Sequence, residues 1–198
     1  MTKIKICGLF RPEDIEAVNR ARPDYVGFVF ASSRRKVDES TAATLRAILD
    51  DGIVPVGVFV DGEMWQVEWL YKNNVIEVAQ LHGHEDAAYI TRLKEKCPGL
   101  PLIKAVTVTS PDDIARAAAL DTEAVLLDSG KGTGSVFDWG FINEVGKRFF
   151  LAGGINCENI NRALAFQPYA IDVSSGAETN GLKDADKINA LVQIAHGA

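Results

Sequence analysis

The sequence has few cysteines and no long apolar run, and these shortages limit the classes of protein to which it can belong. Its three cysteines, Cys7, Cys97 and Cys157, are an odd number at scattered spacing, which fits neither a disulfide framework nor a metal-binding motif. We therefore expect a reducing compartment, the cytoplasm. The first residues lack the apolar core of a signal peptide. No apolar run reaches the roughly 18 residues of a membrane span, so we expect no membrane partner.

An excess of positive charge is also lacking. The 198 residues include 21 Lys and Arg against 27 Asp and Glu, which gives a formal net charge of −6. Nucleic acids and acidic membranes both require clustered positive charge, so we expect no nucleic-acid partner. A small phosphorylated ligand remains compatible with this charge, because a few local donors are enough to bind it.

What the sequence does contain is a regular alternation of short apolar runs with longer amphipathic stretches. Eight such units follow one another at an average spacing of about 25 residues. Near-continuous apolar strands are typical of a parallel sheet that is covered by helices. The expected strands are residues 3–7, 25–30, 54–60, 76–81, 102–106, 124–127, 149–152 and 170–173. The expected helices are residues 11–22, 41–49, 64–71, 86–96, 111–120, 139–145, 158–166 and 185–195.

Eight units favour a closed barrel over an open sheet. We therefore predict an α/β fold, a single (β/α)8 TIM barrel, with residues 1–198 as one catalytic domain, because no linker or change of composition divides the chain. An open Rossmann-like sheet is the alternative.

Barrels of this type carry their active sites at the carboxyl ends of the strands. Several chemically capable residues follow an expected strand directly. They are Cys7, Arg34, Arg35, Asp61, His82, Asp128, Gly153, Gly154, Asp172, Ser174, Ser175 and Gly176.

The last two expected strands end in residues suited to phosphate. Gly153 and Gly154 allow a ligand to approach the backbone closely, and Ser174, Ser175 and Gly176 supply amides and hydroxyls. Phosphate sites in these barrels commonly lie after strands seven and eight. We therefore predict phosphate binding there, although the glycines alone would also fit a tight turn.

Cys7 and Asp128 are ambiguous when local chemistry alone is considered. Cysteine is often an inert core residue, but Cys7 ends a strand where a thiolate would meet a ligand. Asp128 ends an apolar strand, so its carboxylate is either functional or caps a neighbouring loop. Arg34 and Arg35 form either a solvated basic cluster or a site for a carboxylate.

Two further motifs give weaker signals. Residues 131–134 lack the spacing of a nucleotide P-loop and are interpreted as a flexible lid. Residues 82–86 include two histidines and two acids, but we expect no metal there. His84, Glu85 and Asp86 have the pattern of solvent-exposed residues at a helix start.

The strand-end segments together resemble one family, phosphoribosylanthranilate isomerase. The resemblance runs in order from near residue 3 to the final helix. It is carried by Lys5-Ile6-Cys7-Gly8-Leu9, Val26-Gly27-Phe28-Val29-Phe30, Gln80-Leu81-His82-Gly83, Leu126-Leu127-Asp128-Ser129, Gly132-Thr133-Gly134, Ala152-Gly153-Gly154 and Asp172-Val173-Ser174-Ser175-Gly176.

The resemblance implies an Amadori rearrangement in tryptophan biosynthesis and gives roles to the candidates. Asp128 would be the general acid at the furanose ring oxygen, and Cys7 the base that removes the proton from the second sugar carbon. Arg35 would bind the anthranilate carboxylate. His82 and Asp172 would line the sugar region, and the loops after strands seven and eight would hold the phosphate.

No cofactor is expected, because the iminium formed on ring opening is itself the electron sink, and no metal is expected either. The alternatives are another phosphosugar isomerase or epimerase on the same barrel, or a barrel that only binds a phosphorylated ligand. Cys7 in the base position argues against the enzymes that use two carboxylates. Barrels of this kind occur as monomers and homodimers, so both states remain open.

Overall fold

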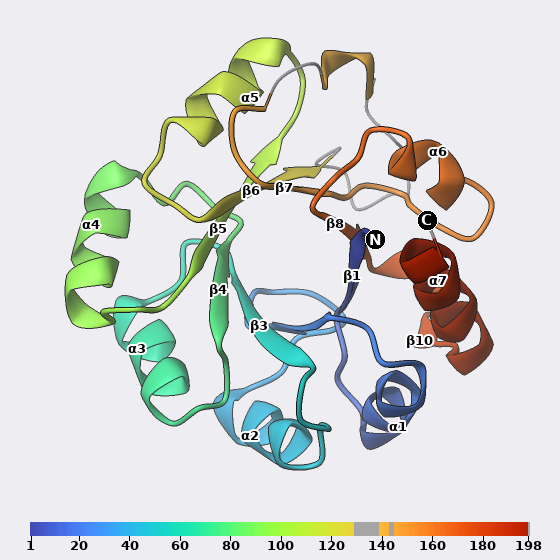
Figure 1. The fold of residues 1–198 in the computed structure, drawn as a ribbon. Coiled ribbons are helices and arrows are strands. Elements are labelled where there is room, and N and C mark those ends of the chain that lie inside the picture. Colours follow the sequence, from blue (N-terminus) through green and yellow to red (C-terminus); the bar gives the residue numbers. More distant parts are fainter. Residues whose placement is uncertain (129–138, 143–144, 198) are drawn as a thin grey trace.

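Eight parallel strands form a closed barrel, surrounded by helices, in the computed structural model (Figure 1). The structure describes residues 1–128, 139–142 and 145–197. Each strand pairs with its neighbours in chain order, and β1 closes the ring against β8. The strands are β1 (Lys3–Cys7), β2 (Tyr25–Val29), β3 (Val54–Phe59), β4 (Val78–Leu81), β5 (Leu102–Thr107), β6 (Ala124–Asp128), β7 (Phe149–Leu151) and β8 (Ala170–Val173).

The helices cover the outside of this ring. They are α1 (Pro12–Ala21), α2 (Glu39–Ala47), α3 (Met64–Lys72), α4 (Ala87–Lys96), α5 (Pro111–Ala118), α6 (Ile160–Leu164) and α7 (Ala185–Gly197), with short 3-10 turns η1 (Trp139–Phe141) and η2 (Ser175–Ala177). The predicted (β/α)8 barrel is therefore confirmed, and the open Rossmann-like sheet is wrong. Within the described residues, no helix is long and apolar enough to cross a bilayer.

Side chains alternate between the two sides of each strand, and this alternation divides the core in two. In β1, Ile4 and Ile6 belong to the larger cluster, which lies between the barrel and its helices. A second cluster fills the barrel itself and includes Val56, Leu126 and Phe150. Residues two positions further along, such as Asp128 after Leu126, consequently also face the barrel axis.

Local signals set most helix starts where the sequence places them. Pro12 and Pro111 occupy the first turns of α1 and α5, where the missing amide proton costs nothing. Asp38 and Asp86 cap α2 and α4 by accepting hydrogen bonds from Thr41 N at 2.7 Å and Tyr89 N at 2.8 Å.

Two parts of the chain differ from the predicted elements. The helix expected at residues 158–166 shortens to α6, because Asn156 and Asn159 bond to each other's backbone in a turn before it. The helix expected at residues 139–145 appears only as η1, and residues 143–144 lie outside the described residues.

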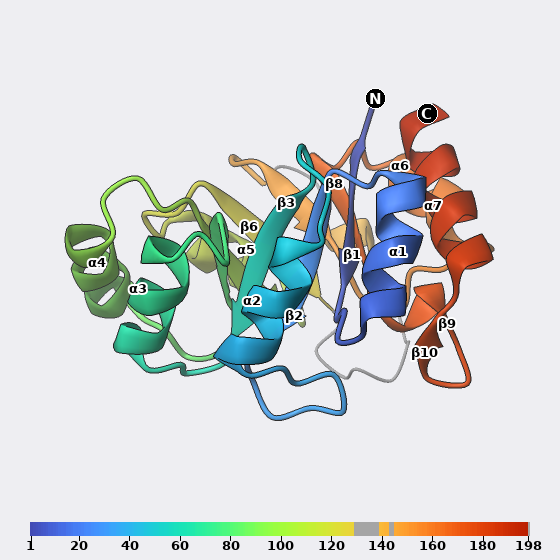
Figure 2. The ribbon, with the colours of Figure 1, turned by 90° about the horizontal axis from the view of Figure 1, so that it is seen from below.

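A short hairpin follows β8 and was not predicted. Its strands are β9 (Glu178–Thr179) and β10 (Leu182–Lys183), which pair antiparallel. In Figure 2 the hairpin lies at the end of the barrel opposite to the two chain termini. Because β1 begins at the N-terminus, the hairpin lies at the carboxyl-terminal ends of the strands.

Candidate active site

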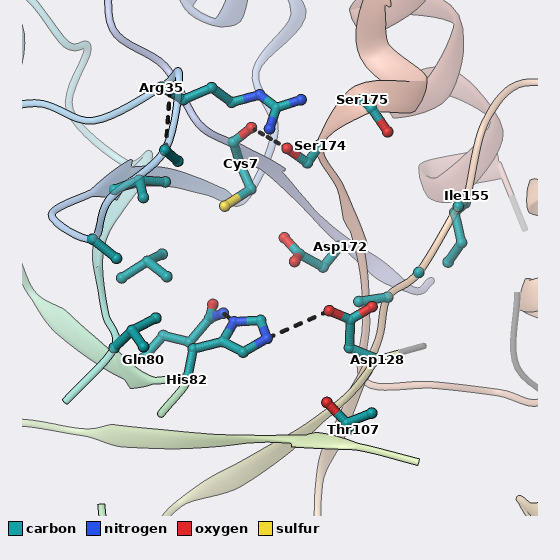
Figure 3. A pocket seen from close by; sticks show the side chains of 18 of the residues that line it. Cys7, Arg35, Gln80, His82, Thr107, Asp128, Ile155, Asp172, Ser174 and Ser175 are labelled. Atoms are coloured by element: carbon teal, nitrogen blue, oxygen red, sulfur yellow. Dashed lines mark hydrogen bonds and ion pairs between the residues drawn. The ribbon is translucent and has the colours of Figure 1, made fainter. Parts of the chain in front are cut away.

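A cavity of about 570 Å³ opens at the carboxyl ends of the strands. Nine of the ten residues predicted for the site line it. They are Cys7, Arg35, His82, Asp128, Gly153, Gly154, Asp172, Ser174 and Ser175. The strand-end rule therefore brings together residues from six strands or the loops that follow them (Figure 3).

Cys7 is the last residue of β1, and its side chain faces the cavity (Figure 3). Only 7% of the residue is exposed. Gly27 lies beside it on β2, and a Cβ at this position would be 2.7 Å from the Cys7 sulfur. A glycine at position 27 therefore makes the space that the sulfur occupies.

Burial and nearby charges have opposing effects on the pKa of the Cys7 thiol. Burial raises the pKa of Cys7, the nearby Lys5 ammonium lowers it, and the Asp172 carboxylate raises it. The net direction is upward. Positive surroundings are present, as a base at this position requires, but they reduce the effect of burial without reversing it.

Asp128 ends β6 on the other side of Asp172 from Cys7 in the close-up view (Figure 3). His82 points toward it, with 3.4 Å between His82 Nε2 and Asp128 Oδ2. The amide nitrogen of Gln80 lies 3.0 Å from His82 Nδ1. If that amide donates, Nδ1 is the acceptor and Nε2 carries the proton toward Asp128.

Arg35 reaches the cavity from the loop after β2, and Glu178 binds its guanidinium. Its Nε and Nη2 donate to the two carboxylate oxygens of Glu178 at 2.6 and 3.0 Å. Glu178 also accepts from Lys183 at 2.9 Å and from Arg34 at 2.5 Å. The Glu178 carboxylate is thus shared by three cations, which leaves this side of the cavity positively charged.

Asp172 points into the cavity from β8 (Figure 3). It forms an ion pair with a buried lysine. Lys5 Nζ donates to Asp172 Oδ1 at 2.8 Å. Neither Lys5 nor Glu178 was among the predicted site residues.

The two loops predicted to bind phosphate lie side by side. Gly153 and Gly154 have φ angles of +88° and +66°, which favour glycine. Ser174 Oγ donates to the carbonyl of Cys7 at 3.2 Å, and Lys183 Nζ donates to the carbonyl of Ser174 at 2.9 Å. The Ser174 loop is therefore tied both to the end of β1 and to the hairpin.

Gly176 is the one predicted site residue that does not line the cavity. It lies in η2, where a Cβ would overlap the carbonyl oxygen of Ile155. Its observed role is therefore to let the loops after β7 and β8 approach each other.

The histidines and acids of residues 82–86 point in different directions. His84 pairs with Asp61 at 2.9 Å, whereas Glu85 binds Lys104 at 2.8 Å. Glu85 was expected in solvent, and this is wrong, because it is 5% exposed. Its oxygens also accept from the backbone amides of Asp61 and Gly83, both at 2.9 Å, so this carboxylate fixes the loop that carries His82.

Sequence reasoning also missed Lys5 and Gln80, although a signal for both was present. Each is a polar residue inside an apolar strand, two positions before a predicted site residue. In a strand that spacing places both side chains on the same face. The lid expected at residues 131–134 lies outside the described residues.

Comparisons of the sequence and of the structure with known proteins both find members of one family. The sequence model of the family described as N-(5'phosphoribosyl)anthranilate (PRA) isomerase matches residues 4–194. An N-(5'-phosphoribosyl)anthranilate isomerase of Endomicrobium trichonymphae is 46% identical over 98% of both chains. One of Clostridium acetobutylicum is 40% identical over 97% of both.

Solved structures of isomerases from the same family are also similar to this chain. The phosphoribosyl anthranilate isomerase of Thermotoga maritima superimposes with a TM-score of 0.90 at 33% identity, covering all of both chains. A second isomerase structure, which contains reduced 1-(o-carboxyphenylamino)-1-deoxyribulose 5-phosphate, superimposes with a TM-score of 0.87 at 32% identity over the same coverage.

Proposed function

The chain belongs to the phosphoribosylanthranilate isomerase family, and on that premise we propose which of its residues carry out the reaction. As a phosphoribosylanthranilate isomerase, it converts N-(5'-phosphoribosyl)anthranilate to 1-(2-carboxyphenylamino)-1-deoxyribulose 5-phosphate in tryptophan biosynthesis. The reaction is an aldose–ketose isomerisation and needs one proton donor and one proton acceptor.

In the proposed mechanism, Asp128 donates its proton to the furanose ring oxygen. The ring carbon–oxygen bond breaks, and the nitrogen lone pair forms an iminium. The carboxylate left on Asp128 faces Nε2 of His82, 3.4 Å away. A proton on Nε2 would stabilise the negative charge at the moment when it appears.

Cys7 then removes the proton from the second sugar carbon. The electrons of that carbon–hydrogen bond flow into the iminium, which gives a neutral enolamine and a Cys7 thiol. The enolamine tautomerises to the ketone. Cys7 and Asp128 line one cavity from separate strands, so that acid and base can act on different atoms of a single substrate.

Arg35 is proposed to bind the anthranilate carboxylate. Its Nε edge is already used by Glu178, which leaves Nη1 and the outer Nη2 proton for a second carboxylate. His82 and Asp172 are proposed to contact the sugar.

The phosphate is proposed to lie between Gly153-Gly154 and Ser174-Ser175, with Gly176 closing the loop. The positive φ angles of the two glycines and the position of both loops after β7 and β8 support this assignment.

We also propose that residues 1–198 act as one domain in the cytoplasm, as a monomer or a homodimer. One similar structure is described as monomers made from the dimeric isomerase of Thermotoga maritima. Light scattering of the purified chain would distinguish the two states by mass.

The observation that carries the proposal is that Cys7, Asp128 and Arg35 line the same cavity. Complementation of a tryptophan auxotroph that lacks this isomerase tests it. The native chain should restore growth and Asp128→Asn should not. Asp121→Asn is the matched control, because this surface carboxylate is 84% exposed beside Lys94. Rescue by Asp128→Asn would contradict the assignment of the acid.

A further inference from the structure

Lys5 is a fully buried lysine that the mechanism above does not use. It is 0% exposed and lies in the interior of the barrel, on the same face of β1 as Cys7. Burying an ammonium ion without partners is costly. A charge at this position therefore requires compensation inside the barrel.

Asp172 provides part of that compensation. Lys5 and Asp172 are direct partners in the register of β1 with β8, and Lys5 Nζ lies 2.8 Å from Asp172 Oδ1. Asp172 lines the cavity, whereas Lys5 does not. The ammonium therefore lies beneath the cavity, where it has no direct access to a substrate.

Cys7 lies two residues after Lys5 on β1, so both side chains project from the same face of the strand. Burial raises the pKa of Cys7, and the charge of the Lys5 ammonium opposes this effect. The Asp172 carboxylate on β8 also raises this pKa, whereas Lys183 on β10 lowers it less than Lys5 does.

The charges around Cys7 do not balance while it is a thiol. Lys5, Lys183, Arg34 and Arg35 contribute four positive charges on its side of the cavity. The carboxylates that pair with them are those of Asp172 and Glu178. A Cys7 thiolate would reduce the remaining positive charge. Across the cavity lie His82 and Asp128, which pair with each other.

We propose that Lys5 is a positioning residue that stabilises the Cys7 thiolate, and that the paired Asp172 carboxylate offsets part of its charge. The inference rests on the proposed role of Cys7 as base. In the reaction, the thiolate takes the proton of the second sugar carbon and becomes a thiol, and Lys5 keeps its own protons throughout.

Two substitutions should act on Cys7 in opposite directions. Lys5→Met keeps most of the length of the side chain but removes the cation, so the thiolate loses its main stabilising charge. Asp172→Asn removes an anion near the sulfur and leaves Lys5 free to act on Cys7 alone. If the ion pair were only structural, the two substitutions would not affect the Cys7 thiolate in opposite directions.

The measurement is the rate of Cys7 alkylation by iodoacetamide as a function of pH, in the unliganded full chain. Only the thiolate reacts, so the midpoint of the rate profile reports its formation. Mass mapping of the modified peptide separates Cys7 from Cys97 and Cys157. Circular dichroism confirms that each variant is folded.

Lys5→Met should raise the midpoint by about one pH unit or more, which is about a tenfold lower alkylation rate below the midpoint. Lys5→Arg should keep the midpoint close to its native value. Lys183→Met should raise the midpoint by less than Lys5→Met does. Asp172→Asn should lower the midpoint, which keeps the test decisive if Lys5→Met does not fold. An unchanged midpoint in folded Lys5→Met, or a raised one in Asp172→Asn, would overturn the proposal.

In Lys5→Met, the acid limb of kcat/KM in the isomerase assay should shift in the same direction as the alkylation midpoint, with little change in KM. The alkylation experiment tests the role of Lys5, and the isomerase assay tests the proposed function, so each can fail without the other. A native chain that isomerises its substrate while Lys5→Met leaves the midpoint unmoved overturns the role of Lys5 alone. A midpoint that shifts in a chain without isomerase activity supports the role of Lys5 and overturns the proposed function.

Discussion

Arg35 donates to both carboxylate oxygens of Glu178, at 2.6 Å from Nε and 3.0 Å from Nη2, although 143 residues separate the two in the chain. This pairing orients the guanidinium before any substrate arrives. Because Lys183 joins the same carboxylate to the carbonyl of Ser174, the hairpin links the proposed carboxylate site with the proposed phosphate site.

Glu178→Gln should therefore weaken substrate binding more than it slows the chemistry. We expect KM to rise about tenfold, the loss of one well-placed charged hydrogen bond, with a smaller fall in kcat. Steady-state kinetics measure both. Arg34→Gln is the matched control, because Arg34 binds the same carboxylate from a side chain that is 56% exposed, and it should change KM less than about twofold. Equal effects of the two substitutions would contradict the orienting role.

Glu178 should also make stability depend on pH. Burial raises the pKa of this carboxyl, but the hydrogen bonds from Arg35 and Lys183 outweigh it and hold the pKa below its usual value. A lowered folded-state pKa stabilises the protein above the unfolded-state value of about 4.3 and loses that contribution as pH falls through the folded-state value.

The free energy of unfolding should therefore decline as the pH is lowered from about 5 toward 3, and less steeply in Glu178→Gln. Urea unfolding at several pH values measures the slope. A variant with the same slope as the native chain would show that other carboxyls account for the decline.

Gly27→Ala should damage both the fold and the site. The new Cβ would lie 2.7 Å from the Cys7 sulfur and 3.1 Å from its Cα, so β1 or the side chain must move. We expect a loss of about 1–3 kcal/mol in the free energy of unfolding, as for other overpacked cores, together with lower activity. Gly197→Ala is the control, since nothing lies within 4 Å of its added Cβ. A fully active and stable Gly27→Ala would show that the sulfur has more room than the structure indicates.

Much of this architecture follows from the sequence, because strands such as β6 and β8 are largely apolar and carry functional groups at or near their carboxyl ends. The rule that places sites at these ends needs no knowledge of side-chain contacts. It therefore located Cys7, Asp128 and Asp172 in one cavity.

The features that the sequence did not predict depend on contacts between residues that are far apart in the chain. The two-residue strands that carry Glu178 and Lys183 are too short to show any periodicity. Glu85 follows the pattern of an exposed helix start, and its burial is explained by its ion pair with Lys104 on β5 and its bonds to the amides of Asp61 and Gly83. Lys5 belongs to the Lys5-Ile6-Cys7-Gly8-Leu9 segment, but its partner Asp172 lies 167 residues away.

The most direct test of the central claim is the turnover of N-(5'-phosphoribosyl)anthranilate by the purified chain and its Cys7→Ser variant. Cys157→Ser is the control, because this free cysteine lies outside the residues that line the cavity. We predict isomerisation by the native chain and by Cys157→Ser, and a kcat about 10²–10⁴-fold lower in Cys7→Ser with unchanged thermal unfolding. A Cys7→Ser variant that turns over at the native rate would contradict it.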